Sequence, residues 1–265
     1  MDHKSATEGA KHNGKKGAGI LFGTDTFLYG YGRVAHSYDF HTLRYIFAGA
    51  EKLREETQRL WYEKFGLRLF EGYGTTETGP VLCVNTSMHY KAGTVGRFLP
   101  GIAHRLRSVE GLSQGGRLSV KGPNIMKGYL LNASPGVITP PPDGWYDTGD
   151  IIQIDAEGYV TLKGRATRFA KIGGEMISLL AVEEALHRLW PEHVHAIVAQ
   201  PDQKKGEILM LFTTFPAADR AALITFWKAQ GLSELSLPKV VKILPALPLL
   251  GSGKIDYKTL ETFQG

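Results

Sequence analysis

The pattern of apolar residues between Leu43 and Phe70 limits the fold more than any other feature of this chain. Leu43–Ala48 is a short apolar run of the kind that forms a buried strand. The segment after it has apolar residues at helical spacing, and Leu67–Phe70 is a second short apolar run. Two buried strands joined by a helix form a β-α-β unit. The sequence therefore predicts an α/β sheet in this part of the chain.

A loop rich in glycine and threonine follows the second predicted strand, from Gly72 to Pro80. A parallel α/β sheet binds its ligand beyond the carboxyl ends of its strands, which is where this loop lies. Glycine lets the backbone approach a ligand closely, hydroxyls bind phosphate oxygens, and a carboxylate can hold Mg²⁺. Thr75-Thr76-Glu77 therefore fits a nucleotide-phosphate clamp, and an ordinary turn after a strand explains the same residues equally well.

The middle and last parts of the chain have different patterns. Gly93–Gly164 is rich in glycine and has short alternating segments, which predict antiparallel strands and a hairpin. Ser178 is suited to cap a helix, and apolar strands and a second helix follow it. These form an α+β unit of about 100 residues, a size that can make a domain of its own. We therefore expect a flexible leader at 1–18, a larger domain part at 19–165 and a small domain at 166–265.

Composition narrows the class of protein. The 265 residues are 43% hydrophobic and 22% charged, which is typical of a globular protein and excludes a mostly disordered or fibrous one. The longest apolar stretches fall far short of the ~18 residues that a transmembrane helix needs. The single cysteine, Cys83, allows no internal disulfide, so we expect a reducing compartment. The net charge of +5 suits an acidic partner, an anionic membrane surface or nucleic acid without choosing among them.

Three further groups of residues could carry chemistry. Asp150 follows a glycine in a predicted turn, where its carboxylate could bind ribose hydroxyls or simply serve the turn. Gly164-Arg165 and Lys171–Glu175 place basic residues and a glycine pair at the expected domain boundary. Gly251-Ser252-Gly253-Lys254 places a lysine on a glycine loop, although most lysines are simply solvated at the surface.

The order and spacing of these groups resemble the adenylate-forming superfamily, which contains acyl- and aryl-CoA ligases, peptide synthetase adenylation domains and luciferases. Within it, the chain looks most like the synthetase half of the bacterial bifunctional 2-acylglycerophosphoethanolamine acyltransferase / acyl-acyl carrier protein synthetase. The segments that carry the resemblance are Phe70–Glu77, Gly115–Gly122, Gly122–Met126, Lys127–Leu130, Tyr146–Asp150, Gly164-Arg165, Arg168–Ile172 and Leu247–Lys254.

The resemblance implies a nucleotide site. Tyr73, between Gly72 and Gly74, would stack on adenine beside the backbone of Gly49-Ala50-Glu51. Thr76 would bind the α-phosphate and Glu77 would hold Mg²⁺, so ATP or AMP and Mg²⁺ are the implied cofactors.

The resemblance also implies roles further along the chain. Asp150 and Arg165 would hold the ribose, and Lys254 would be the catalytic lysine of adenylation. A lysine is a compact charge on a flexible stem, which suits it to bridging a carboxylate and a phosphate. Gly174 would line the tunnel for the thiol, and the small domain would rotate about Thr167, where many relatives have Asp or Lys.

The implied activity is ligation of a fatty acid to a thiol, associated with lysophospholipid reacylation. The acid and ATP would give acyl-adenylate and pyrophosphate, and a phosphopantetheine thiol would then take the acyl group. Acyl carrier protein is the expected acceptor, because it is acidic and this chain is basic. Arg168 and Lys171 are the candidate contacts.

Two alternatives to this activity are an acyl-CoA ligase and a non-catalytic nucleotide- or carrier-protein-binding module. Nucleic-acid binding has only the basic charge in its favour, so we expect no nucleic-acid partner. The implied location is the cytoplasm, with the full-length protein peripheral on the bacterial inner membrane.

The Ser/Thr/Gly-rich phosphate loop of the superfamily has no match between Met1 and Ala50. The resemblance therefore implies the C-terminal part of the large adenylation domain, a partial sheet with a β-rich subdomain, followed by the small mobile α+β domain. We expect the isolated chain to be inactive and to bind AMP about as well as ATP.

Overall fold

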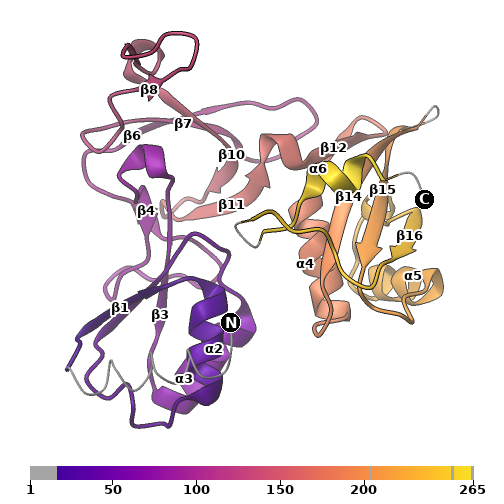
Figure 1. Cartoon of the computed structure of the whole chain (residues 1–265), viewed down its shortest axis with the longest axis horizontal. Coiled ribbons are helices and arrows are strands. Elements are labelled where there is room, and N and C mark those ends of the chain that lie inside the picture. The colour runs from indigo at the N-terminus through magenta and orange to yellow at the C-terminus, as the bar shows by residue number, and fades with distance from the viewer. Residues whose placement is uncertain (1–16, 203–204, 252–253, 264–265) are drawn as a thin grey trace. The chain divides into compact units, whose positions relative to one another are not determined.

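The computed structural model describes residues 17–202, 205–251 and 254–263, and it divides into two compact units (Figure 1). The first unit comprises Met1–Arg105, Ser119–Thr148 and Gln153–Leu162. The second comprises Leu106–Leu118, Gly149–Ile152 and Lys163–Gly265. Most of the predicted leader, and Ser252-Gly253 of the lysine loop, lie outside the described residues.

A five-stranded sheet forms the base of the first unit, in the order β1-β2-β3-β4-β5. The first three strands are parallel, and β4 and β5 continue the sheet in antiparallel fashion. The predicted β-α-β unit is confirmed by β2, α3 and β3. The elements are β1 (Ile20–Gly23), α2 (Asp25–Val34), β2 (Tyr45–Ala48), α3 (Glu55–Phe65), β3 (Leu69–Tyr73), β4 (Cys83–Val84) and β5 (Arg97–Phe98).

The core of the first unit lies between this sheet and its two helices. Leu28 of α2, Trp61 of α3 and Ile46 of β2 are almost fully buried in it. The indole Nε1 of Trp61 donates a hydrogen bond to the Leu28 carbonyl oxygen at 2.8 Å, which ties the two helices together. The helix α3 ends at Gly66, whose φ of 68° is left-handed. This packing brings the loops after β2 and β3 to one edge of the sheet.

The middle of the chain is rich in strands, as predicted, and β8 and β9 pair in antiparallel fashion. A four-stranded sheet has the order β11-β10-β7-β6, and β8 and β9 pair separately. The predicted hairpin lies at Asp155–Tyr159, where the Asp155 N–H donates to the Tyr159 carbonyl oxygen at 3.0 Å. The strands are β6 (Ala103–Arg107), β7 (Gly116–Lys121), β8 (Tyr129–Leu130), β9 (Ile138–Thr139), β10 (Tyr146–Ile154) and β11 (Val160–Arg165).

The α+β part of the second unit has a sheet in the order β13-β12-β15-β14, and β16 pairs in parallel with β15. Ser178 caps the first helix as predicted, because its Oγ accepts a hydrogen bond from the Ala181 N–H at 3.2 Å. The elements are β12 (Phe169–Ile172), β13 (Glu175–Ser178), α4 (Leu179–Leu189), β14 (His195–Asp202), β15 (Gly206–Thr213), α5 (Arg220–Ala229), β16 (Val240–Ile243) and α6 (Tyr257–Glu261).

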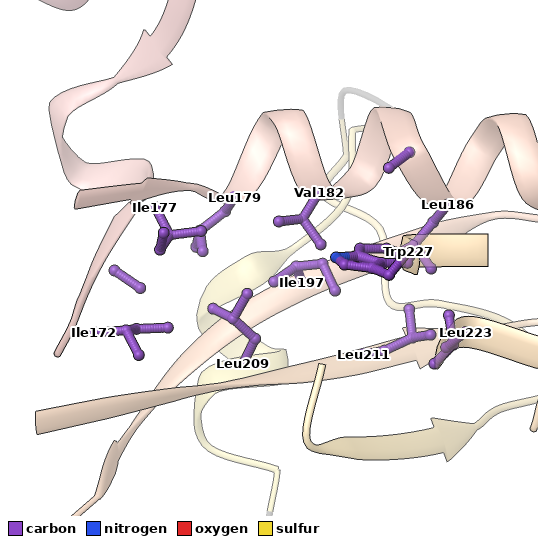
Figure 2. Close-up of a cluster of buried hydrophobic side chains, with 12 residues drawn as sticks. Ile172, Ile177, Leu179, Val182, Leu186, Ile197, Leu209, Leu211, Leu223 and Trp227 are labelled. Atoms are coloured by element: carbon purple, nitrogen blue, oxygen red, sulfur yellow. The ribbon is translucent and has the colours of Figure 1, made fainter. Parts of the chain in front are cut away.

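Apolar side chains pack against both faces of this sheet. Figure 2 shows Leu179, Val182 and Leu186 of α4 directed at strand residues such as Ile197 and Leu209. The opposite face packs against Leu247, which precedes the lysine loop, and against Leu260 of α6. None of the helices in the described part of the chain has the length and hydropathy of a membrane span.

Candidate functional site

The loop after β3 turns back on itself at Gly74. A Cβ atom on Gly74 would lie 1.7 Å from the Pro80 carbonyl oxygen, so no other residue fits there without moving the backbone. A Cβ on Gly72 would lie 3.2 Å from the Cys83 carbonyl oxygen of β4. These close approaches fix the backbone on both sides of Tyr73, whose side chain is buried.

Thr78 holds the rest of this loop in place, while Thr76 stays exposed. The Thr75 N–H donates to the Thr78 Oγ1 at 2.9 Å, at the start of the 3₁₀ helix Thr76–Thr78. Asn124 donates from its side-chain amide to the Val81 carbonyl oxygen at 2.9 Å and also to the Thr78 carbonyl. Thr78 is therefore a structural residue, whereas Thr76 lies on the solvent side of the loop.

Glu77 carries the negative charge of the loop. The Tyr129 hydroxyl donates to its Oε1 at 2.9 Å. Hydrogen bonds from backbone and from hydroxyl groups hold the pKa of the Glu77 carboxyl below its usual value, against the effect of partial burial. Glu77 is therefore ionised at neutral pH. No cluster of three His, Cys, Asp or Glu residues that could hold a metal occurs within the described ranges.

The chemistry of Glu77 fits one mode of Mg²⁺ binding. Mg²⁺ is commonly held by one or two carboxylates together with substrate phosphates and water. A single ionised carboxylate beside the exposed Thr76 fits that mode, in which the nucleotide itself supplies ligands.

The loop after β2 lies beside the loop after β3. A Cβ on Gly49 would lie 3.8 Å from the Gly72 carbonyl oxygen. Ala50 has a φ of 65°, a left-handed conformation that costs a non-glycine residue about 1–2 kcal/mol. Glu51 accepts a hydrogen bond from the Thr26 Oγ1 at 2.9 Å, which anchors the far side of the turn. The structure thus brings together the two segments that we associated with adenine.

Asp150 and Arg165 meet in the second unit. The Arg165 Nε lies 3.4 Å from the Asp150 Oδ1, with the carboxylate buried and the guanidinium exposed. Gly149 has a φ of 74°, so the chain turns immediately before the carboxylate. Arg165 itself precedes the 3₁₀ helix Ala166–Arg168, which contains the expected hinge residue Thr167.

Lys254 and Gly174 also belong to the second unit. Lys254 is exposed, and its carbonyl oxygen accepts a hydrogen bond from the Leu250 N–H at 2.7 Å. Gly174 lies in the turn between β12 and β13 with a φ of 88°, and a Cβ placed on it would meet no atom within 4 Å. The loops around Tyr73 and Glu77 belong to the first unit, so the structure brings each group of site residues together within its own unit.

Arg168 does not have the environment that we expected of a carrier-protein contact. Its Nη1 donates to the Ile197 carbonyl oxygen at 2.8 Å, and its Nη2 donates to the Glu183 Oε1 at 2.6 Å. Its side chain is only 18% exposed, so these internal partners leave little of the guanidinium for a carrier protein to contact. Lys171 is half exposed and pairs with Glu110 at 3.0 Å. Sequence reasoning missed Glu183, whose signal was a carboxylate inside the apolar stripe of α4.

Comparison with known proteins indicates which class of protein this chain resembles. The family of AMP-binding enzymes matches residues 8–130. The long-chain-fatty-acid–CoA ligase of Yersinia pestis is 30% identical over 228 residues, which are 82% of this chain and 40% of that protein. The acetyl-coenzyme A synthetase of Bacillus subtilis is 27% identical over 243 residues, 87% of this chain and 42% of that protein.

Solved structures of similar fold include enzymes of the same kind. ATP-bound MatB of Rhodopseudomonas palustris superposes with a TM-score of 0.80 at 25% identity, covering 98% of this chain and 53% of that one. The o-succinylbenzoate CoA synthetase of Bacillus subtilis, in complex with its acyl-adenylate intermediate, gives 0.82 at 22% identity, covering 100% and 54%. The predicted mixed α/β fold class is therefore confirmed.

The chain is similar to the AMP-binding enzymes of the adenylate-forming superfamily, and acyl-CoA ligases are among its homologues. It spans about two fifths of the length of the curated relatives that it matches, and about half of the solved chains.

Proposed function

We propose that this chain is part of an AMP-forming ligase that joins a carboxylic acid to a phosphopantetheine thiol. The observation that carries the proposal is the pair of adjoining loops at Gly49–Glu51 and Gly72–Glu77, which place an ionised carboxylate and an exposed threonine at one edge of a parallel sheet. A ligand with an aromatic base and phosphates suits such an edge. ATP is the substrate, and AMP leaves at the end.

The reaction has two steps in this proposal. A carboxylate oxygen attacks the α-phosphorus of ATP, so the acyl-adenylate forms and pyrophosphate leaves. The thiol then attacks the acyl carbon, so the thioester forms and AMP leaves with the electron pair of the broken bond. Mg²⁺ would supply positive charge to the phosphates. Thr76 binds an α-phosphate oxygen, Glu77 would hold the metal when it is bound, and Lys254 stabilises the charge of the first transition state.

The proposed roles of the other site residues concern the adenosine. Tyr73 stacks on the base, and Asp150 and Arg165 hold the ribose hydroxyls. The ion pair between Asp150 and Arg165 supports this role, because it places a carboxylate acceptor and a guanidinium donor side by side, and charged groups make strong hydrogen bonds to hydroxyls. Gly174 lies at an open turn, which supports its proposed place beside the thiol.

A fatty acid is the proposed acid, because relatives include ligases for long-chain fatty acids. Acyl carrier protein is the acceptor that we propose, and CoA is the alternative that the names of the curated relatives favour. Full-length protein loaded with labelled fatty acid and ATP distinguishes the two when CoA and holo carrier protein are offered in turn.

The function is tested by replacing Lys254 with alanine in the full-length protein. Loss of one preorganised donor should slow adenylation at least 10²-fold, roughly 3 kcal/mol, while transfer from supplied acyl-adenylate stays nearly unchanged. Lys258→Ala, an exposed lysine of α6, is the matched control and should leave both steps unchanged. Equal slowing of both steps by Lys254→Ala would refute the role.

A further inference from the structure

Glu183 has a carboxylate side chain that is only 13% exposed, and it joins four elements of the second unit. Its Oε1 accepts hydrogen bonds from the Arg168 Nη2 at 2.6 Å and from the Ile197 N–H at 2.8 Å. Its Oε2 accepts one from the Tyr257 hydroxyl at 3.2 Å. Glu183 itself lies on α4, and the donors come from the 3₁₀ helix Ala166–Arg168, from β14 and from α6.

Arg168 and Tyr257 also contact each other directly. The guanidinium carbon of Arg168 lies 3.6 Å from the centre of the Tyr257 ring, within the distance of a cation–π contact. Burial and the Glu183 charge raise the pKa of the Tyr257 hydroxyl, so it keeps its proton and donates. Both oxygens of the Glu183 carboxylate therefore have donors, and the Arg168 charge is neutralised where it is buried.

This network is linked to Lys254 by a short, hydrogen-bonded stretch of chain. Ile255 forms an antiparallel bridge with Leu249, and the Leu250 N–H donates to the Lys254 carbonyl oxygen. The Asp256 N–H donates to the Pro248 carbonyl oxygen at 2.9 Å. Tyr257, the first residue of α6, comes directly after this hairpin, which leaves three residue steps between the lysine and the ring.

We propose that Glu183, through Arg168 and Tyr257, positions the hairpin that carries Lys254. The inference rests on the proposed role of Lys254 in adenylation. Arg168 directly follows Thr167, the proposed hinge, so the network joins the start of the small domain to the hairpin near its end. Glu183, Arg168 and Tyr257 are positioning residues, and none of them contacts the reacting atoms.

Tyr257→Phe tests the proposal selectively, because it removes only the hydroxyl that donates to Glu183 and keeps the ring under Arg168. In the full-length protein, adenylation should fall about tenfold, the effect of losing one hydrogen bond to a charged group. Transfer from supplied acyl-adenylate should change less than about twofold, since Lys254 acts in the first step alone. Tyr29→Phe is the matched control, because it removes a 2.8 Å bond from tyrosine to Glu56 in the first unit.

Glu183→Gln provides a second variant, in which an acceptor remains but the charge that holds Arg168 is gone. It should show the same split between the two steps, with a larger loss in adenylation. Equal slowing of both steps in Tyr257→Phe would overturn the proposal, because a network that merely stabilises the fold affects both. Adenylation that matches the Tyr29→Phe control would also overturn it.

Hydrogen exchange in the 265-residue chain tests this inference independently of the proposed function, because it does not depend on activity. Tyr257→Phe should speed exchange at the Leu250 and Asp256 amides and leave the β14 and β15 amides protected. Unchanged exchange at Leu250 and Asp256 overturns the inference even if Lys254→Ala abolishes adenylation. Faster exchange with no effect of Lys254→Ala on adenylation would instead refute the proposed function and remove the role in catalysis that we infer here.

Discussion

At the scale of single residues, the loops of the candidate site depend on conformations that only certain side chains allow. Gly74 has no room for a Cβ atom, and Ala50 is held in a left-handed conformation. The glycines of this loop could be found in the sequence, because glycine is the residue that such turns require. The strain at Ala50 could not, since nothing in the identity of an alanine signals a positive φ.

The burial of polar residues could not be predicted from the sequence either. His195 is buried on β14, where its Nε2 donates to the Trp190 carbonyl oxygen at 2.9 Å and the Thr213 hydroxyl lies 2.8 Å from its Nδ1. Burial, together with His187 and His193, lowers the pKa of the His195 imidazole, against the effect of the Trp190 hydrogen bond. The folded second unit therefore holds His195 in its neutral form.

This burial predicts a stability that depends on pH. The unfolded chain binds a proton at His195 more readily than the folded chain, so stability is complete above the usual histidine pKa of about 6.5 and falls as the pH drops below it. The urea midpoint of the second unit should be lower at about pH 5.5 than at about pH 7.5. His195→Gln should lose part of this dependence, and the exposed His89→Gln should retain it. A midpoint that rises on acidification would contradict the assignment.

At the scale of elements, the strongly patterned segments were predictable and α2 was not. The apolar spacing of α3 and α4 identified both helices, because burial of one face sets that spacing. Helix α2 contains Gly30 and Gly32, which lower helix propensity and hide the pattern. The close packing of α2 on α3 explains one of these glycines, since a Cβ on Gly32 would lie 2.8 Å from the Leu60 Cδ2 and 3.1 Å from the Trp61 Nε1.

The two glycines of α2 should respond in opposite ways to alanine. Gly30 has no heavy atom within 4 Å of its Cβ position, so Gly30→Ala should stabilise the first unit by about 0.5–1 kcal/mol. Gly32→Ala should destabilise it by about 1 kcal/mol, because the Leu60 and Trp61 side chains must shift to admit the Cβ atom, and Trp61 is held by its hydrogen bond to Leu28. Urea unfolding of the two variants measures both changes. The same sign for both would show that the helices pack differently.

At the scale of the whole molecule, the sequence predicted the α/β fold class and the β-rich middle part of the chain. The chain resembles longer proteins over part of their length. The choice between carrier protein and CoA as the proposed acceptor would depend on surface charge rather than on fold. Arg168 is mostly buried and pairs with Glu183. A basic surface for an acidic partner would therefore depend on more exposed residues such as Lys171. The sequence alone could not show which of Arg168 and Lys171 is exposed, because both are basic residues near the same segment boundary.

Transfer to an acidic carrier protein should be sensitive to salt. Raising the salt from about 50 to 500 mM shortens the Debye length to a few ångströms, so the apparent affinity for carrier protein should fall while adenylation changes little. Lys171→Glu should weaken the affinity at low salt, and Arg107→Glu would show whether any basic residue of the unit has this effect. An affinity that stays flat across this range would count against electrostatic recognition of the carrier protein.

Nucleotide binding by the 265-residue chain, measured by titration calorimetry with AMP and with ATP, tests the proposed nucleotide site most directly. We expect saturable binding of AMP and no tighter binding of ATP, because the chain lacks a match to the phosphate loop. Asp150→Asn should weaken AMP binding about tenfold or more, through loss of a charged acceptor for the ribose. Asp155→Asn, in the hairpin Asp155–Tyr159, should not, because Asp155 pairs with Lys91 instead. Absence of AMP binding, or AMP binding that is indifferent to Asp150→Asn, would contradict the proposed adenosine site.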